Sequence, residues 1–575
     1  MNKAALLHIP KSNYAYAVDE NTLCIRFRSG KEDLKKITLF YGDKFDLDNM
    51  KFCNMEKIFT DDLFDYFEAY IQVLYNRYAY YFKLESLNET VYFGEYGVMN
   101  HLDISKLYFN IFQFPYIHKR DLHYIPNWVN NRIFYQIFPD RFFKSQKLFT
   151  KSKFNNWDEL PTSTSLYGGN LLGIIEKLDY LEELGVNAIY LNPIFKSPSN
   201  HKYDTTDYFE IDENFGTKDH LKLLVNEAHK RKFKIILDCV FNHCGFDFKY
   251  FQHVVKNGKK SKYFNWFYIN GNKVNISPPN YLTFAFTYKM PKLNTSNKEV
   301  REFLISVCKY WTKEFNIDGW RLDVADEIDH EFWREFRKAL KEINKDILIL
   351  GENWHDSYPW LLGDQHDGVM NYPITKVCIE YFGEGKITSK EFSNAISNIL
   401  IRNKDIVNKA MLNLLDSHDT PRFISYCKNI DILKLSLLFL MTFIGMPCIY
   451  YGTEILTQGK GDPDCRRTFN WNKETWNKDF ITYVKRLIEI RKKEKLLQTG
   501  KIKIYCQNHL LIMERFNEKE KIVVVFNNSN YKNNFKYKCF FAKELVNNLI
   551  VLIKDEYIDE NIDEYQGRVY KILKN

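Results

Sequence analysis

The stretch Gly319-Trp320-Arg321-Leu322-Asp323 is the clearest member of the pattern that decides the fold. It is a short, mostly apolar segment that ends on a carboxylate, and it follows an amphipathic segment of helical periodicity at 300–315. Other helical patterns occur at 171–184 and 218–231. Seven more short apolar segments alternate with such helical sequence, at 133–138, 188–192, 235–240, 347–352, 368–372, 411–416 and 447–451. Eight strands that alternate with helices predict an α/β fold closed into a (β/α)8 TIM barrel.

The chain of 575 residues is longer than one barrel needs, and the pattern changes before the barrel begins. Residues 1–122 contain segments that alternate with a period of two, for example at 23–28, and this predicts an N-terminal β-sandwich. Within it, the segments 70–73 and 79–84 are separated by Asn76-Arg77, which predicts a hairpin.

The barrel itself is assigned to residues 123–497. Alternating segments return after it and predict a C-terminal β-sandwich at 498–575. The stretch 244–294 follows the third barrel strand and is too long for an ordinary loop. We therefore expect a small excursion domain there.

The composition excludes several classes of protein. The 81 Lys and Arg against 73 Asp and Glu give a net charge of +8, and no block of basic residues marks a nucleic-acid groove. The 11 Cys include no CxxC pair and indicate reduced thiols. The longest apolar run, 435–451, is broken by Gly445 and Pro447, and the first residues lack a signal-peptide pattern. The sequence therefore predicts a cytoplasmic protein that binds neither nucleic acid nor a membrane.

Acidic residues follow four of the predicted barrel strands. Asp238 lies in the third strand, Asp323 ends the fourth, Glu352 ends the fifth, and the seventh runs into Asp416 and Asp419. The active site of a barrel forms at the carboxyl ends of its strands. Carboxylates without a zinc-type ligand motif point either to a hard cation or to acid/base chemistry on a glycosidic bond.

Asp323 and Glu352 have the placement that a retaining glycosidase requires. Adjacent strands lie about 4.8 Å apart, and retaining enzymes hold their two carboxyls ~5 to 5.5 Å apart. Arg321 faces the same way as Asp323, so we expect its charge to lower the pKa of Asp323 and keep this nucleophile ionised. Glu352 follows an apolar strand and precedes Trp354, a setting that favours its keeping a proton as general acid. Asp419, from across the barrel, would bind sugar hydroxyls.

These residues stand in motifs that resemble the four signature regions of the α-amylase family of glycoside hydrolases. The resemblance covers about residues 130–470 and rests on Asp238-Cys239-Val240-Phe241-Asn242-His243, Gly319 through Glu327, Gly351-Glu352-Asn353-Trp354-His355 and Leu415-Asp416-Ser417-His418-Asp419. It implies a double displacement on α-glucosidic bonds with retention. It also implies Asp323 as nucleophile, Glu352 as acid/base and Asp419 as transition-state stabiliser.

The same resemblance implies roles for the residues around the sugars. His243, Arg321 and His418 would bind around the first sugar, and Tyr203 resembles the tyrosine that stacks on its ring. Trp354 and Glu327 resemble acceptor-side residues, whereas Asp204 is expected to be structural, holding Arg321 or a loop.

A finer resemblance comes from Met290-Pro291-Lys292-Leu293-Asn294, which looks like the mark of the neopullulanase, cyclomaltodextrinase and maltogenic amylase subgroup. It implies hydrolysis of α-1,4 and also α-1,6 bonds in cyclodextrins, malto-oligosaccharides and pullulan, with transglycosylation. The N-terminal unit is similar to the subgroup's starch-binding-type module. That module packs over the partner's active site in a homodimer and narrows it.

Two alternatives and one departure accompany this interpretation. A non-catalytic carbohydrate-binding barrel would retain the fold, and an α-glucosidase of the same family would retain the catalytic residues. The departure is the loop where the subgroup often binds calcium, which here reads Phe143-Lys144-Ser145-Gln146-Lys147, with Gly168-Gly169-Asn170 further on. Lysines among few carboxylates suit a hard cation poorly. We therefore predict no metal at that site, and no organic cofactor.

Overall fold

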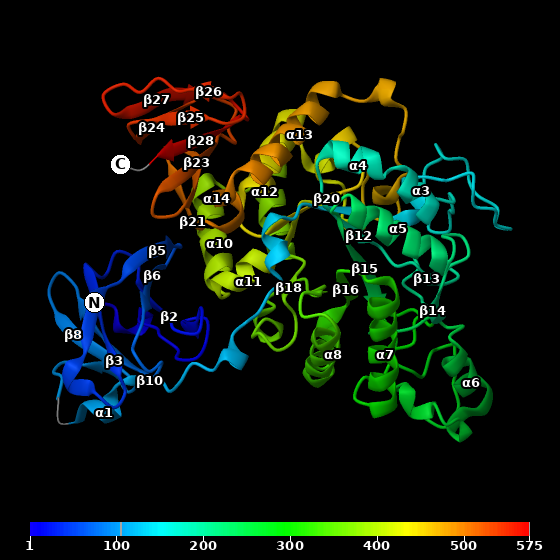
Figure 1. The fold of residues 1–575 in the computed structure, drawn as a ribbon, viewed down its shortest axis with the longest axis horizontal. Coiled ribbons are helices and arrows are strands. Elements are labelled where there is room, and N and C mark those ends of the chain that lie inside the picture. Colours follow the sequence, from blue (N-terminus) through cyan, green and yellow to red (C-terminus); the bar gives the residue numbers. More distant parts are fainter. Residues whose placement is uncertain (104–105, 574–575) are drawn as a thin grey trace.

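The computed structural model describes residues 1–103 and 106–573 and consists of three parts (Figure 1). An N-terminal β module and a C-terminal β module lie against one side of a central barrel. Among the described residues, no helix combines the length and the apolar character needed to cross a membrane.

The central part is the predicted (β/α)8 barrel. Its eight strands are parallel and lie in the order β18-β17-β16-β15-β12-β11-β20-β19. A parallel bridge between Met370 and Leu412 joins the two ends of this sheet and closes the ring. The strands are β11 (Phe134–Ile137), β12 (Ala188–Leu191), β15 (Lys234–Val240), β16 (Gly319–Asp323), β17 (Leu348–Gly351), β18 (Gly368–Val369), β19 (Leu412–Leu414) and β20 (Met446–Tyr450). Each falls on a predicted segment.

Helices surround the strands, and several of them begin at a residue whose side chain caps the first turn. Thr217 forms a capping box at the start of α5, and Asp329 accepts a hydrogen bond from a backbone N–H at the start of α8. The helix expected at 171–184 is divided at Lys177 into two shorter ones. The helices of the barrel part are α2 (Pro139–Phe142), α3 (Leu171–Glu176), α4 (Leu178–Leu184), α5 (Lys218–Lys230), α6 (Lys249–Asn257), α7 (Lys298–Phe315), α8 (His330–Ile343), α9 (Tyr372–Cys378), α10 (Ser389–Ile401), α11 (Asp405–Ala410), α12 (Ile430–Thr442), α13 (Lys478–Lys493) and α14 (Lys495–Thr499).

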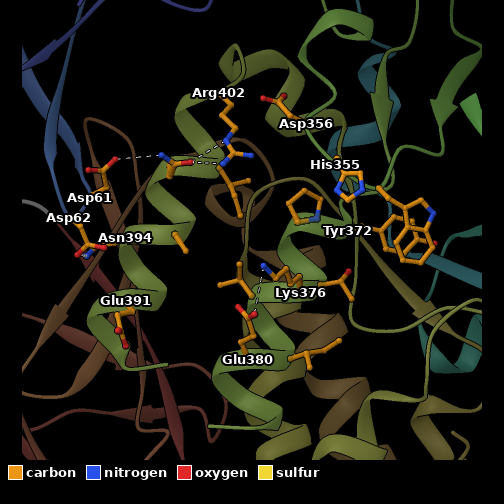
Figure 2. Close-up of a pocket in the computed structure, with 18 of the residues that line it drawn as sticks. Asp61, Asp62, His355, Asp356, Tyr372, Lys376, Glu380, Glu391, Asn394 and Arg402 are labelled. Carbon is orange, nitrogen blue, oxygen red and sulfur yellow. Dashed lines mark hydrogen bonds and ion pairs between the residues drawn. The ribbon is translucent and has the colours of Figure 1, made fainter. Parts of the chain in front are cut away.

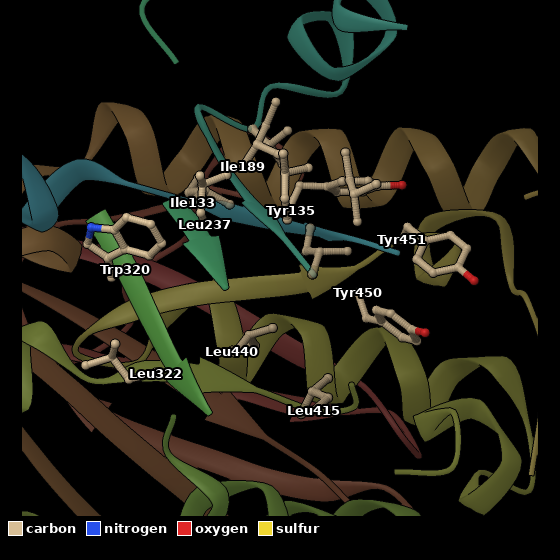
Figure 3. Packing of buried hydrophobic residues seen from close by; sticks show 14 of the residues in the cluster. Ile133, Tyr135, Ile189, Leu237, Trp320, Leu322, Leu415, Leu440, Tyr450 and Tyr451 are labelled. Carbon is tan, nitrogen blue, oxygen red and sulfur yellow. The ribbon is translucent and has the colours of Figure 1, made fainter. Parts of the chain in front are cut away.

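Alternation along the strands separates the core from the site. In β16, Trp320 and Leu322 face outward into the layer between strands and helices, where Figure 3 shows them among other buried apolar side chains. The indole N–H of Trp320 reaches Thr312 of α7 at 3.1 Å. Because side chains alternate along a strand, Arg321 and Asp323 face the barrel axis.

The N-terminal module is a β-sandwich, as predicted, built from a sheet in the order β1-β2-β6-β5 and a sheet in the order β4-β3-β7-β8-β9, with β10 beside β7. Its strands are β1 (Ala15–Ala17), β2 (Leu23–Gly30), β3 (Lys36–Asp43), β4 (Lys51–Asn54), β5 (Glu56–Thr60), β6 (Phe64–Ile71), β7 (Tyr78–Glu85), β8 (Thr90–Gly94), β9 (Gly97–Met99) and β10 (Phe112–Phe114).

The predicted hairpin at 70–73 and 79–84 is wrong. The two segments belong to β6 and β7, which lie in opposite sheets. Phe67 and Ile71 of β6 pack into the same core as Tyr80 and Phe82 of β7. Alternation shows that a strand buries one face, but it does not distinguish a neighbour in the sheet from a partner across the core.

The C-terminal module also contains two sheets. A six-stranded sheet runs in the order β21-β22-β23-β28-β25-β26, and β24 pairs with β27. The strands are β21 (Lys501–Gln507), β22 (Leu510–Phe516), β23 (Glu520–Phe526), β24 (Asn533–Lys538), β25 (Ala542–Glu544), β26 (Leu549–Ile550), β27 (Tyr557–Ile562) and β28 (Gly567–Leu573).

The excursion after the third barrel strand holds α6 and several short antiparallel bridges. One bridge joins Lys292 to His243, directly after β15, and another joins Leu293 to Phe267. The excursion therefore returns to the end of the strand that it leaves, beside the predicted site.

Candidate active site

Asp323 and Glu352 meet at the carboxyl ends of adjacent strands. The register pairs Leu322 of β16 with Gly351 of β17, so the residues that follow them stand at the same level. Their side chains are 8% and 6% exposed, and both contact one guanidinium group. Arg321 Nη1 lies 2.8 Å from Asp323 Oδ1, and Arg321 Nη2 lies 2.8 Å from Glu352 Oε1. The two carboxyls therefore share a single fixed cation.

Asp238, which the sequence analysis placed at this rim without assigning it a role, completes the cluster. Its carboxylate lies 3.0 Å from Arg321 Nη1 and accepts hydrogen bonds from Tyr190 Oη at 2.7 Å and Tyr203 Oη at 2.9 Å. The spacing could have indicated its place: Asp238 is two positions after Ile236, whose side chain lies in the barrel interior, and side chains two positions apart on a strand face the same side.

A second group of side chains approaches from the opposite side of the barrel. His418 Nε2 lies 2.6 Å from Tyr203 Oη and 3.1 Å from Asp419 Oδ2, and the rings of Tyr203 and His418 are parallel within 4°. Gln136 Nε2 lies 2.9 Å from His418 Nδ1, and Arg466 Nη2 lies 3.4 Å from Asp419 Oδ1. The sequence analysis did not predict Gln136 or Arg466 as site residues. Gln136 lies near the end of the first predicted strand, but the analysis selected acidic residues at strand ends and Gln is not acidic.

The electrostatics of the cluster differ from the expectation. Burial raises the pKa of Asp323 well above its ordinary range, the charge of Glu352 adds to this, and Arg321 opposes it. Arg321 does lower the pKa of Asp323, as expected, but burial and the charge of Glu352 outweigh it, so the net shift is upward. Removing the carboxyl from water outweighs the attraction of one guanidinium that several carboxyls share.

Asp419 shows the same effect. Burial, followed by the charge of Glu352, raises the pKa of Asp419 to about 7, although Arg321 and Arg466 oppose the shift. Burial lowers the pKa of His418, so this ring is neutral at pH 7. Burial and the mutual repulsion of these carboxyls therefore favour the protonated forms of Asp323 and Asp419 in the free site.

His243 and Glu327 lie on the side of the site that the excursion covers. The His243 ring is 1% exposed and lies on Phe284, with centroids 4.7 Å apart, and its Nε2 has no hydrogen-bond partner. Glu327 is half exposed and pairs with Lys292, whose Nζ lies 2.7 Å from Glu327 Oε2. Both residues therefore stand at the rim and not in the carboxylate cluster.

The loops that carry Tyr203 and His243 are in close contact. A Cβ atom on Gly245 would lie 2.3 Å from the carbonyl oxygen of Asp204, so only glycine permits this approach. The Asp204 carboxylate accepts from Ser197 Oγ at 2.5 Å and also from Ser199. Asp204 thus holds its own loop and not Arg321.

Trp354 lies where the site opens into a groove. Its indole N–H is 3.3 Å from Glu352 Oε1, and the residue is 42% exposed. From Trp354 and Tyr372 a groove of about 920 Å³ continues past α9 and α10 to residues 61–64 of the N-terminal module (Figure 2). There Asn394 Nδ2 donates to Asp62 Oδ1 at 2.6 Å, which fixes the module to the barrel.

The described residues contain no group of three or more His, Cys, Asp or Glu arranged to hold a metal ion. Asn170, in the segment where the subgroup often places calcium, caps α3 by accepting from the Gly173 N–H at 2.8 Å. Lys147 pairs with Glu176 at 3.0 Å.

Comparison with known proteins identifies the family of the chain. The family model described as alpha amylase, catalytic domain, matches residues 136–493, and the one described as alpha amylase, N-terminal ig-like domain, matches residues 1–118. The chain belongs to the α-amylase family and is a glycosidase of that family.

Individual relatives resemble the chain over nearly its whole length. It is 44% identical to a cyclomaltodextrinase of Geobacillus thermopakistaniensis, covering 92% of both chains. It is 43% identical to a maltogenic alpha-amylase of Bacillus acidopullulyticus, covering 96% of both. A solved cyclomaltodextrinase structure superposes with a TM-score of 0.95 at 36% identity and covers 100% of both chains.

Proposed function

We propose that this protein hydrolyses α-1,4-glucosidic bonds in cyclodextrins and malto-oligosaccharides, and also α-1,6 bonds as in pullulan, with retention and with transfer to sugar acceptors. The observation that carries the proposal is the Arg321 guanidinium, which contacts Asp323 and Glu352 at 2.8 Å each. This geometry supports a pair of carboxyls close enough for a double displacement.

The reaction follows from the positions of the two acids. Glu352 donates a proton to the glycosidic oxygen while the Asp323 carboxylate attacks the anomeric carbon, so the leaving sugar departs as an alcohol. A covalent glucosyl ester on Asp323 results. Glu352, now ionised, takes a proton from water or from a sugar hydroxyl, whose oxygen displaces Asp323 and restores the α configuration. Water as acceptor gives hydrolysis, and a sugar gives transfer.

Side chains around the two acids hold the sugars in this proposal. Tyr203 offers its ring face to the first sugar, while His243, His418 and Arg321 surround that sugar. Asp419 binds its hydroxyls most strongly in the distorted transition state. On the acceptor side, Trp354 supplies a stacking face and Glu327 a hydrogen-bond acceptor.

We also propose a homodimer in which the N-terminal module covers the partner's site. The proposal is supported by large apolar side chains that the described part of the module exposes to solvent. They include Phe45, Phe52, Leu63, Leu74, Tyr75, Leu87, Tyr96 and Phe109. A cytoplasmic location is proposed with it, supported by cysteines that are all unpaired.

Product analysis on β-cyclodextrin, pullulan and starch tests the substrate proposal. We expect faster turnover of β-cyclodextrin than of starch and, by NMR, an initial product in the α configuration. A β product would contradict retention. Equal or faster turnover of starch would contradict a covered site.

A further inference from the structure

Val324, the residue after the proposed nucleophile, has a backbone conformation that is rare for its residue type. Its dihedral angles are φ 43° and ψ 47°, in the left-handed region. A side chain branched at Cβ is strained there, and glycine or asparagine is the usual occupant. Strained residues are concentrated at functional sites, where the surrounding structure holds them in place. The contacts of the turn between β16 and the short helical segment Ala325–Glu327 show what holds Val324.

Three hydrogen bonds connect this turn to Glu352. The Glu352 N–H donates to the Leu322 carbonyl at 2.8 Å, and the Ala325 N–H donates to the Glu352 carbonyl at 3.1 Å. The third bond reaches the side chain, because the Val324 N–H donates to Glu352 Oε2 at 3.0 Å. Successive N–H groups of a regular strand point to opposite sides. The left-handed residue turns two successive N–H groups toward one side, as in the backbone nests that bind anions.

The bond to Oε2 is the best-formed hydrogen bond of the Glu352 carboxyl. Trp354 Nε1 lies 3.3 Å from Oε1. Arg321 Nη2 lies 2.8 Å from Oε1, but its N–H groups make no hydrogen bond within the part of the chain that the structure describes. A backbone donor is held by the chain on both sides, whereas the indole and the guanidinium belong to side chains. Val324 therefore fixes the rotation of the carboxyl group.

The fixed donor also decides which oxygen of Glu352 carries a proton. An N–H group cannot accept a hydrogen bond, so Oε2 must accept whether the carboxyl is ionised or neutral. In the neutral acid Oε2 is then the carbonyl oxygen, and the proton is on Oε1. Oε1 is the oxygen beside Trp354, where the site opens into the groove.

We propose that Val324 is a positioning residue whose left-handed backbone directs its N–H onto Glu352 Oε2 and so turns Oε1, with the proton, toward the oxygen of the leaving sugar. The departure of a sugar rests on the proposed function, whereas the hydrogen bond does not. One residue of main chain thus connects the nucleophile Asp323 to the general acid.

The test removes this N–H group and nothing else. Incorporation of 2-hydroxy-3-methylbutanoic acid at position 324 replaces the Val324 amide by an ester, whose oxygen cannot donate. Because one atom changes, the fold should persist.

Two substrates are then compared. β-Cyclodextrin needs a proton from Glu352 when its glycosidic bond breaks. α-Maltosyl fluoride needs none, because Asp323 attacks the anomeric carbon while the C–F bond breaks and its electron pair leaves with fluoride. The quantity compared is kcat/KM, which includes only the steps up to the ester on Asp323.

In the Val324 ester we expect kcat/KM for β-cyclodextrin to fall roughly 10- to 100-fold, as for one hydrogen bond to a charged group, and kcat/KM for α-maltosyl fluoride to stay within about twofold of the native value. Val324→Gly keeps the N–H and permits the left-handed conformation, so it should retain the native ratio of the two values. The matched control is an Ala325 ester made with lactic acid. It removes a bond to the Glu352 carbonyl and should lower the melting temperature without changing the ratio.

Equal losses on both substrates, or no loss on either, would overturn the proposal. A Val324→Gly variant that behaved like the Val324 ester would attribute the effect to the side chain and would also overturn it. An equal change of the ratio in the Ala325 ester would overturn the specific role of Val324. Melting temperatures and circular dichroism are measured for every variant. Failure of the proposed function looks different, because the native enzyme itself would turn over neither substrate.

Discussion

Trp354 lies flat on Tyr372, with ring centroids 3.8 Å apart and 4° between the planes. One face of the indole is therefore covered, and only the other is open to a sugar. The stack also keeps the indole N–H 3.3 Å from Glu352 Oε1. Trp354 thus links the general acid of the proposed reaction to the groove that leads away from it.

Replacing Trp354 with Ala should impair transfer more than hydrolysis. An acceptor sugar would lose a stacking contact of about 0.5–1.5 kcal/mol, which corresponds to a roughly three- to tenfold weaker acceptor KM, whereas water needs no stacking face. The measurement is the ratio of transfer to hydrolysis products with maltotriose and added glucose. An unchanged ratio would place the acceptor elsewhere.

Asp323→Asn should lower kcat by roughly 10³–10⁶-fold, as losses of a covalent nucleophile do. The amide retains the shape of the side chain, and it removes one of several carboxyls that compete for Arg321, so folding should persist. The checks are steady-state rates on β-cyclodextrin and circular dichroism. Activity that survives in a folded variant would show that the nucleophile is another residue.

The raised pKa of Asp419 predicts a pH dependence of stability. An unfolded Asp titrates near pH 4, whereas Asp419 titrates at about 7 in the fold. Between these values the folded state binds more protons, so the free energy of unfolding decreases as the pH rises through this window. The Asp419→Asn variant has no carboxyl to ionise, so it avoids this decrease in the free energy of unfolding. We expect it to melt at a higher temperature than the native enzyme at pH 8, and we expect a smaller difference at pH 5.

Thermal melting at both pH values checks this expectation. Asp431→Asn is a suitable control because Asp431 is 52% exposed at the start of α12. The same difference in melting temperature at pH 5 and at pH 8 would contradict the titration of Asp419.

Calcium should be unnecessary. The oxygen of Asn170 that a cation would need already accepts the Gly173 N–H, and Lys147 lies beside Glu176. Dialysis against EDTA should therefore leave the activity and the melting temperature unchanged. Tightly bound calcium in a metal analysis, lost together with activity, would refute the prediction.

A homodimer should appear in sedimentation velocity at micromolar concentration. If the partner's module restricts the site, dilution to the monomer should raise the rate on starch relative to that on β-cyclodextrin. A monomer at all concentrations, or a constant ratio, would rule out this explanation of a restricted site.

Much of this molecule followed from local sequence. Eight apolar segments that alternate with helical patterns predicted the barrel, and β16 was found with the predicted bounds, Gly319–Asp323. The carboxyl ends of parallel strands must share one rim, so Asp323 and Glu352 were expected to meet. The order of these residues along the chain is read directly from the sequence. The sequence also shows that Arg321 faces the same side of the strand as Asp323, because the two are two positions apart.

Other features depended on contacts between distant segments. The hairpin expected around Asn76 became a crossing between sheets, because alternation shows which face is buried but not against what. The pKa of Asp323 rises mainly because the closed barrel buries this carboxyl, and also because Glu352 and Asp238 are brought beside it from neighbouring strands, a sum that no single strand reveals. Gln136 and Arg466 reach His418 and Asp419 only when the ring of strands closes, and Lys292 reaches Glu327 only when the excursion folds back. The sequence by itself determined which residues alternate along strands and which residues end them, since these follow from local stereochemistry. Tertiary structure decided which groups are buried and which charges share one partner, since these depend on neighbours from distant parts of the chain.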